Sequence, residues 1–154
     1  MTMGNYISRL CMPKFLFKNH GDGDADEDES WHNVEFSSEN VHLIATGEEW
    51  EEKMEEAKKD DKIVIVNFSA SWCVPCRAIA PLYSELSEKH LSWMFLVVDV
   101  DVLSDLSSTW DIKATPTFFF LRGGQQFEKV IGANKEELQK KVAAVADSET
   151  PSQP

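Results

Sequence analysis

The stretch Trp72-Cys73-Val74-Pro75-Cys76 decides how the rest of this chain is interpreted. It follows an apolar run at residues 63–68 and precedes a segment in which Ile79, Leu82 and Leu86 recur at helical spacing. Two thiols therefore lie where a buried strand gives way to the start of a helix. A helix start carries partial positive charge and free N–H groups, which stabilise a thiolate. Because the thiolate is the form that attacks a disulfide, the placement predicts redox chemistry at these cysteines.

Composition limits the class of protein. The chain has 154 residues, which suits one domain, and 42% of them are hydrophobic. The net charge of −12 argues against a nucleic-acid partner, since a phosphate backbone attracts basic proteins. Three cysteines are too few, and odd in number, for a secreted disulfide scaffold, so we expect a reducing, cytoplasmic location. No run approaches the ~18 apolar residues of a membrane span.

The sequence divides into three parts. Residues 1–30 are predicted to form a flexible extension, basic up to Lys18 and strongly acidic over 21–30. A calcium loop counted from Asp22 would need glycine where Glu27 stands, so the acidic stretch is interpreted as a solvated linker. Residues 31–147 are predicted to be the folded domain, and 148–154 a disordered tail.

The domain is predicted to alternate strands and helices. Apolar runs predict strands at 41–45, 63–68, 95–98, 117–121 and 127–131, with a helix after each of the first three strands and one after the last. Thr46 with Glu49, and Asn134 with Glu137, have the spacing of helix caps. Early strand–helix alternation implies parallel pairing, and Gly123-Gly124 predicts an antiparallel hairpin. The expected fold class is α/β, with a central mixed five-stranded sheet flanked by helices.

With its surroundings, the cysteine motif resembles the thioredoxin family. The resemblance rests on Phe68-Ser69-Ala70-Ser71-Trp72-Cys73-Val74-Pro75-Cys76-Arg77, on Ala114-Thr115-Pro116-Thr117 and on Gly132-Ala133, and it covers roughly residues 40–147. The stretches 33–36, 113–121 and 130–135 look like the plant h-type thioredoxins, closest to the subgroup with an N-terminal extension and an extra cysteine. The resemblance implies a thioredoxin fold and protein-disulfide reductase activity without a bound cofactor.

The resemblance also implies roles for the residues of the motif. Cys73 is the expected exposed nucleophile, and Cys76, one helical turn further on, is the more buried resolving thiol. Trp72 flanks the site, and Pro75 stiffens the turn. The expected partners are proteins that contain disulfides, together with an electron donor, either thioredoxin reductase or glutathione with glutaredoxin.

A second group of residues is assigned to substrate binding by the same resemblance. Pro116 matches a cis-proline that faces the cysteines and leaves the backbone of Thr115 able to pair with an incoming peptide. Gly132 and Ala133 match a flat apolar contact surface. Asp101 matches an aspartate near a strand end and is interpreted as structural.

Three positions depart from the family pattern. Asn67 stands where most thioredoxins have a buried aspartate, and Val97 where they have a nearby lysine. An amide cannot take up a proton, so general-base help to Cys76 from residue 67 is lost. Val74 replaces the commoner glycine, and its branched side chain is expected to affect which partners fit.

Two N-terminal residues, Cys11 and Gly4, can each be interpreted in more than one way. Cys11 takes part in the redox cycle, is acylated, or is an unreacted thiol. Gly4 fits the myristoylation pattern if translation starts at Met3. Acyl groups on both residues would provide the two anchors that peripheral membrane association needs.

Other functional classes remain as alternatives. The motif also fits a disulfide isomerase, or a redox-regulated binding module with little turnover. A zinc site would need two more ligands, and the histidines and Cys11 are not at paired spacing, so we expect no metal.

Overall fold

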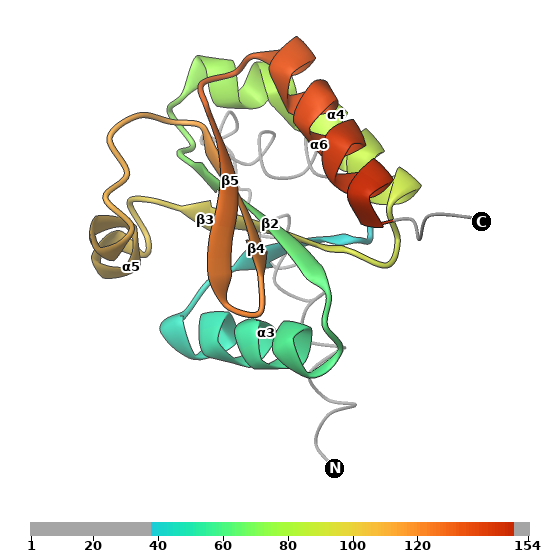
Figure 1. Ribbon diagram of the computed structural model, residues 1–154. Coiled ribbons are helices and arrows are strands. Elements are labelled where there is room, and N and C mark those ends of the chain that lie inside the picture. Colours follow the sequence, from blue (N-terminus) through green and yellow to red (C-terminus); the bar gives the residue numbers. More distant parts are fainter. Residues whose placement is uncertain (1–37, 150–154) are drawn as a thin grey trace, which may run out of the picture.

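The computed structural model describes residues 38–149 of the chain (Figure 1). Within this range the elements follow the order that the sequence predicts, and most bounds agree within two residues. They are β1 (Val41–Ile44), α3 (Gly47–Lys59), β2 (Ile63–Ser69), α4 (Val74–Lys89), β3 (Met94–Asp99), α5 (Ser104–Thr109), β4 (Thr117–Arg122), β5 (Gln125–Ile131) and α6 (Lys135–Glu149).

The strands form a five-stranded mixed sheet in the order β1-β3-β2-β4-β5. β1, β3 and β2 are parallel, whereas β4 pairs antiparallel with β2 and β5 antiparallel with β4. This confirms the predicted α/β class, with parallel strands first and an antiparallel hairpin at the edge. The central strand β2 is buried along its whole length, because helices cover both faces of the sheet.

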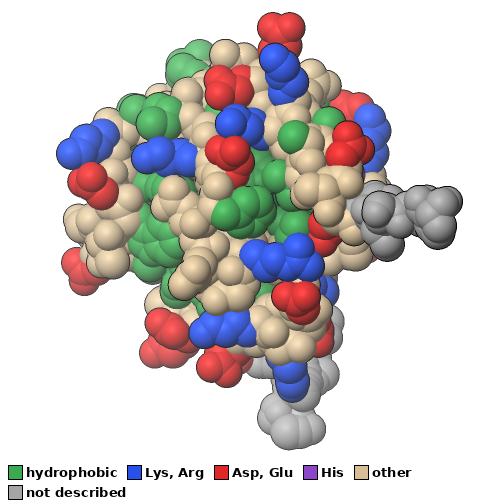
Figure 2. All heavy atoms as spheres, in the orientation of Figure 1, with side chains coloured by type: hydrophobic (Ala, Val, Ile, Leu, Met, Phe, Trp, Pro, Cys, Tyr) green, Lys and Arg blue, Asp and Glu red, His purple; other side chains and the backbone are tan. Residues whose placement is uncertain are grey.

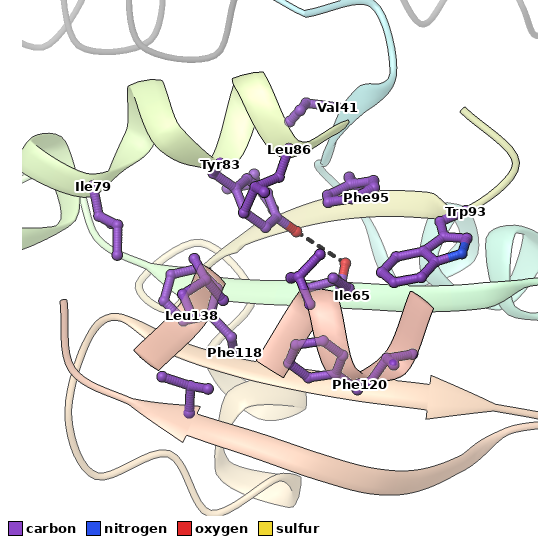
Figure 3. Packing of buried hydrophobic residues seen from close by; sticks show 14 of the residues in the cluster. Val41, Ile65, Ile79, Tyr83, Leu86, Trp93, Phe95, Phe118, Phe120 and Leu138 are labelled. Atoms are coloured by element: carbon purple, nitrogen blue, oxygen red, sulfur yellow. Dashed lines mark hydrogen bonds between the residues drawn. The ribbon is translucent and has the colours of Figure 1, made fainter. Parts of the chain in front are cut away.

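Helices α4 and α6 cover one face of the sheet, and α3 and α5 pack on the other (Figure 1). Side chains of β2 alternate between the two sides, with Ile63 and Ile65 facing α4 and Val64 and Val66 facing α3. Figure 3 shows the first side, where Ile79, Tyr83 and Leu86 of α4 meet the aromatic side chains of β3 and β4.

Polar side chains fix where the helices begin and end. The hydroxyl of Thr46 accepts from the backbone N–H of Glu49 at 3.1 Å, while the Glu49 carboxylate accepts from the N–H of Ala45 at 2.7 Å. Asn134 caps α6 in a similar way, accepting from the N–H of Glu137 at 3.0 Å. Both predicted caps are therefore present, and each satisfies N–H groups that a helix start leaves unpaired.

The end of α6 differs from the boundary that the sequence predicts. The helix continues to Glu149, beyond the expected end of the domain at residue 147. The Glu149 carboxylate accepts from the indole N–H of Trp93 at 3.2 Å and pairs with Arg122 at 3.2 Å. These contacts hold the last turn against the sheet, and an apolar pattern cannot reveal them. The predicted extension at 1–30 and the rest of the tail lie outside the described residues.

The surface mixes charges of both signs. In Figure 2, acidic and basic side chains are interspersed on the visible face, with exposed hydrophobic side chains between them. Among the described helices, none is long and apolar enough to cross a membrane.

Tyr83 connects α4 to two neighbouring strands. Its fully buried hydroxyl lies 2.9 Å from the carbonyl oxygen of Ile65 on β2 (Figure 3). It also lies 2.8 Å from the carbonyl oxygen of Leu96 on β3. Burial raises the pKa of Tyr83 well above its ordinary value, so the phenol remains a neutral donor.

We expect Tyr83→Phe to lower the free energy of unfolding by roughly 1–3 kcal/mol, because buried carbonyl groups lose a donor while the ring packing stays. Urea unfolding of the wild-type and variant proteins measures this change. An unchanged slope of the free energy of unfolding against urea concentration would show that both proteins expose a similar surface on unfolding. Equal midpoints would contradict the stabilising role of the hydroxyl.

Candidate active site

Cys73 and Cys76 form a disulfide at the N-terminal end of α4. Their Cα atoms are 5.2 Å apart, within the range of ordinary disulfides. Cys73 is the cap residue of the helix, and its Sγ accepts from the backbone N–H of Cys76 at 3.2 Å. Pro75 occupies the first turn, where a missing N–H costs nothing. The cysteine pair thus lies at a helix start, as the sequence predicts.

The burial of Cys73 corrects one expectation. The resemblance implies an exposed nucleophile, yet Cys73 is only 3% exposed, and Cys76 is fully buried. Both cysteines pack in a small apolar cluster with Ala70 and Val100. As the helix cap, Cys73 turns its sulfur inward toward the helix N–H groups, which explains the low exposure. Cys76 is the more buried of the two, as expected.

The loop before β4 closes over the disulfide. The peptide bond between Thr115 and Pro116 is cis, as the resemblance implies. The carbonyl oxygen of Thr115 lies 3.6 Å from the Sγ of Cys73. In the disulfide Cys73 has no S–H, so this approach is a contact; once the disulfide is reduced, a thiol there has an acceptor in reach.

Gly132 connects the last strand to this loop. Its N–H donates to the carbonyl of Pro116 at 2.8 Å, and its φ of 93° favours glycine. A Cβ at this position would meet nothing within 4 Å, so the backbone conformation is the constraint. Ala133 is half-buried and packs against the core cluster beneath α4 and α6. The structure therefore brings Gly132 to the loop that carries Thr115 and Pro116, while Ala133 borders the core.

Trp72 lies beside the disulfide and is 66% exposed. Its indole N–H donates to a carboxylate oxygen of Asp101 at 2.7 Å. Asp99 accepts in turn from the N–H of Asp101 at 2.8 Å, which shapes the turn after β3. Interpreting Asp101 as structural missed its contact with Trp72. The signal was present in Asp99, the last residue of a buried strand, and in Asp101 two residues beyond it.

Further apolar side chains are exposed in the motif, in the turn after β3 and at the end of β5. Val74, the first residue of α4, is 64% exposed. Its expected effect on which partners fit stays a prediction. Val102 follows Asp101 and Ile131 precedes Gly132, and both are exposed. Neither Val102 nor Ile131 is expected from the sequence, because isolated apolar residues at strand and turn ends have no periodic signal.

Asn67 lies on β2 between Val97 of β3 and Phe118 of β4. Its side chain is fully buried, and neither the amide nitrogen nor the amide oxygen has a hydrogen-bond partner among the described residues. Val97 is equally buried, so neither position carries charge in this part of the core. Within residues 38–149 no three His, Cys, Asp or Glu side chains gather as metal ligands.

Comparison with known proteins agrees with this geometry. The model of the Thioredoxin family matches residues 41–144. The chain belongs to the thioredoxin family. It is 64% identical to Thioredoxin H9 of Arabidopsis thaliana over 130 residues, which are 83% of this chain and 93% of that protein. It is 58% identical to a Thioredoxin H-type of Populus jackii over 143 residues, 93% of this chain and 97% of that protein.

A solved structure shows the same likeness. The crystal structure of a poplar wild-type thioredoxin h is 64% identical, with a TM-score of 0.69 over 70% of this chain and 97% of that chain. These relatives confirm the plant h type that the sequence resembles. Gly4 and Cys11 lie outside the described residues.

We expect Asn67→Asp to make stability depend on pH. Burial disfavours the charged form, so the pKa of the new carboxyl should lie above the unfolded value of ~3.9. Between these two values the folded state binds more protons, so the free energy of unfolding should fall as pH rises and level off above the folded pKa. Near neutral pH the carboxylate should also accept the Cys76 proton and speed release of a mixed disulfide.

Urea unfolding across pH and stopped-flow release of a labelled thiol measure the two effects. Gln139→Glu, which adds one carboxyl at an exposed position of α6, is the control for a general effect of charge. Identical pH profiles and release rates for wild type and Asn67→Asp would contradict the reasoning.

Proposed function

We propose that this chain is a protein-disulfide reductase that passes electrons from an external donor to disulfides in other proteins through Cys73 and Cys76. The single observation that carries the proposal is the disulfide at the start of α4, opposite the cis peptide bond before Pro116. The family and its h-type members support the same activity.

The reaction follows from the geometry of the helix start. In the reduced protein the Cys73 thiolate is stabilised by the helix N-terminus and by the N–H of Cys76. It attacks a substrate disulfide, breaking that S–S bond and forming a mixed disulfide while one substrate sulfur leaves. Cys76 then attacks Cys73, releases the second substrate sulfur and restores the disulfide described here. Two electrons pass from the cysteine pair to the substrate.

The surface around the disulfide fits an extended peptide. The backbone of Thr115 lies beside Cys73, so a substrate strand that pairs with it would bring its own disulfide to the sulfur. The exposed side chains of Trp72, Val74 and Ile131 form an apolar border on which such a segment can rest. Asp101 holds the Trp72 indole and thereby fixes one side of this border.

We expect Cys73→Ser to abolish reduction of insulin disulfides, because the attacking sulfur is gone. Cys76→Ser should instead accumulate mixed disulfides with substrates, since the releasing thiol is missing. Turbidity of reduced insulin and non-reducing electrophoresis measure these outcomes. Normal turnover of Cys73→Ser would overturn the proposal, whereas stable complexes without turnover in the wild type would favour a binding module.

The proposed location is the cytoplasm, where reduced thiols persist, and the proposed donor is either thioredoxin reductase or glutathione with glutaredoxin. Cys11 offers a way to distinguish the donors, because a third thiol can attack the Cys73–Cys76 disulfide or accept glutathione. Acylation of Cys11 and Gly4 is the competing use, which would bring the protein to a membrane surface.

We expect Cys11→Ser to slow reduction by glutathione with glutaredoxin while sparing reduction by NADPH and thioredoxin reductase. Reduction of the oxidised full chain by each donor in turn measures the difference. Equal rates for wild type and Cys11→Ser with both donors would contradict a redox role. Labelling with an alkyne fatty acid then tests whether Cys11 and Gly4 are acylated.

A further inference from the structure

The carboxylate of Asp99, the last residue of β3, shapes the turn that follows this strand. Its Oδ1 atom accepts from the backbone N–H of Asp101 at 2.8 Å and from that of Val102 at 3.3 Å. An aspartate that bonds to the backbone two residues further on forms an Asx turn. The carbonyl oxygen of Asp99 also accepts from the N–H groups of Val102 and Leu103, at 3.1 Å and 2.9 Å. Residues 99–103 are therefore held in one compact turn by Asp99.

This turn contacts the active site at two points. Val100 packs in the apolar cluster of the two cysteines, and its N–H donates to the carbonyl of Ser69 at the end of β2 at 2.9 Å. One residue further on, the carboxylate of Asp101 accepts from the indole N–H of Trp72 at 2.7 Å. The backbone of the turn thus determines where the Asp101 carboxylate lies relative to the sulfurs.

Trp72 depends on this carboxylate for its orientation. The Trp72 side chain is 66% exposed, so packing alone holds little of the ring. Asp101 is exposed as well, and a carboxylate in solvent keeps one position only where its backbone is fixed. A contact residue that is already ordered loses less side-chain freedom when a partner binds, which strengthens binding. The carboxylate that fixes the turn therefore bears on how well a substrate binds beside Trp72.

We infer that Asp99 is a positioning residue for the proposed reaction: its carboxylate fixes the turn after β3, so that Asp101 holds the Trp72 ring in the orientation that a substrate meets. Asp99 acts through Asp101 and takes no part in the transfer of electrons. The effect on substrate binding rests on the proposed reductase activity, whereas the ordering of the Trp72 ring does not.

The geometry of the turn determines which side chains can replace that of Asp99. Asparagine has a carbonyl oxygen at the same distance from the backbone, so it can accept from both N–H groups without a charge. Glutamate keeps the charge but is longer by one methylene, and an Asx turn needs the shorter side chain. Alanine has no acceptor. Asp99→Asn should therefore preserve the turn, while Asp99→Glu and Asp99→Ala should loosen it.

Fluorine NMR of the full chain labelled with fluorotryptophan tests the ordering of Trp72 without any turnover. Trp72 is one of five tryptophans, and the signal that is missing from Trp72→Phe assigns its resonance. Asp101→Ala gives the position of that resonance when the hydrogen bond is lost. Asp99→Ala and Asp99→Glu should move the Trp72 resonance toward this position, and Asp99→Asn should leave it where it is in the wild type.

Initial rates of insulin reduction, with dithiothreitol as the donor, separate binding from chemistry. Loss of one hydrogen bond changes an equilibrium by about two- to tenfold, so Asp99→Ala should raise the KM for insulin by about this factor. The kcat should stay close to that of the wild type, because the cysteine pair is unchanged. Since Asp99 acts through Asp101, the double variant Asp99→Ala/Asp101→Ala should have the KM of Asp101→Ala alone.

Asp105→Ala is the matched control, since it removes one exposed carboxylate from α5, the helix that follows the turn. It should leave both the Trp72 resonance and the KM unchanged. A wild-type Trp72 resonance in Asp99→Ala, or in the milder Asp99→Glu where Asp99→Ala does not fold, would overturn the inference. So would a double variant whose KM exceeds that of Asp101→Ala. Normal insulin reduction by Cys73→Ser would instead overturn the proposed function and leave the ordering of Trp72 standing.

Discussion

The packing of α4 against β2 is the constraint on which the rest of this structure depends. Tyr83 fixes the register of the helix over the strand, and the apolar side chains on either side of it complete the contact. The start of α4 is thereby held at the end of β2, beside the loop that carries Thr115 and Pro116. Because the packing of α4 against β2 is fixed, the Cys73 sulfur lies beside the N–H groups of the helix start and faces the carbonyl of Thr115.

Two opposing effects act on the cysteine pair. The apolar cluster of Ala70 and Val100 disfavours a thiolate, while the N-terminus of α4 favours it. Cys73 receives the larger share of the second effect, since it caps the helix and accepts from a backbone N–H. Cys76 lies one turn further inside the helix and is fully buried, so the apolar surroundings act on it more strongly.

Two apolar side chains of the motif, those of Trp72 and Val74, are exposed although the chain carries a net charge of −12. Both residues flank Cys73 in the sequence. The carboxylate of Asp101 accepts a hydrogen bond from the Trp72 indole and so fixes the position of the ring. In the proposed reaction these two side chains offer a protein substrate an apolar contact, with the overall charge acting at longer range. The backbone of Thr115 then pairs with main-chain groups, which every substrate segment carries. Such a site can therefore accept many partner sequences.

The sequence alone determined the class of the fold, the five strands and the cysteines at a helix start, because apolar periodicity and helix caps are local properties. The resemblance added the cis-proline and the roles of Cys73 and Cys76. The contact of Asp101 with Trp72, the inward turn of Cys73 and the continuation of α6 to Glu149 were decided by the tertiary structure. Each depends on atoms brought together from separate elements, and no local pattern records the distance between them.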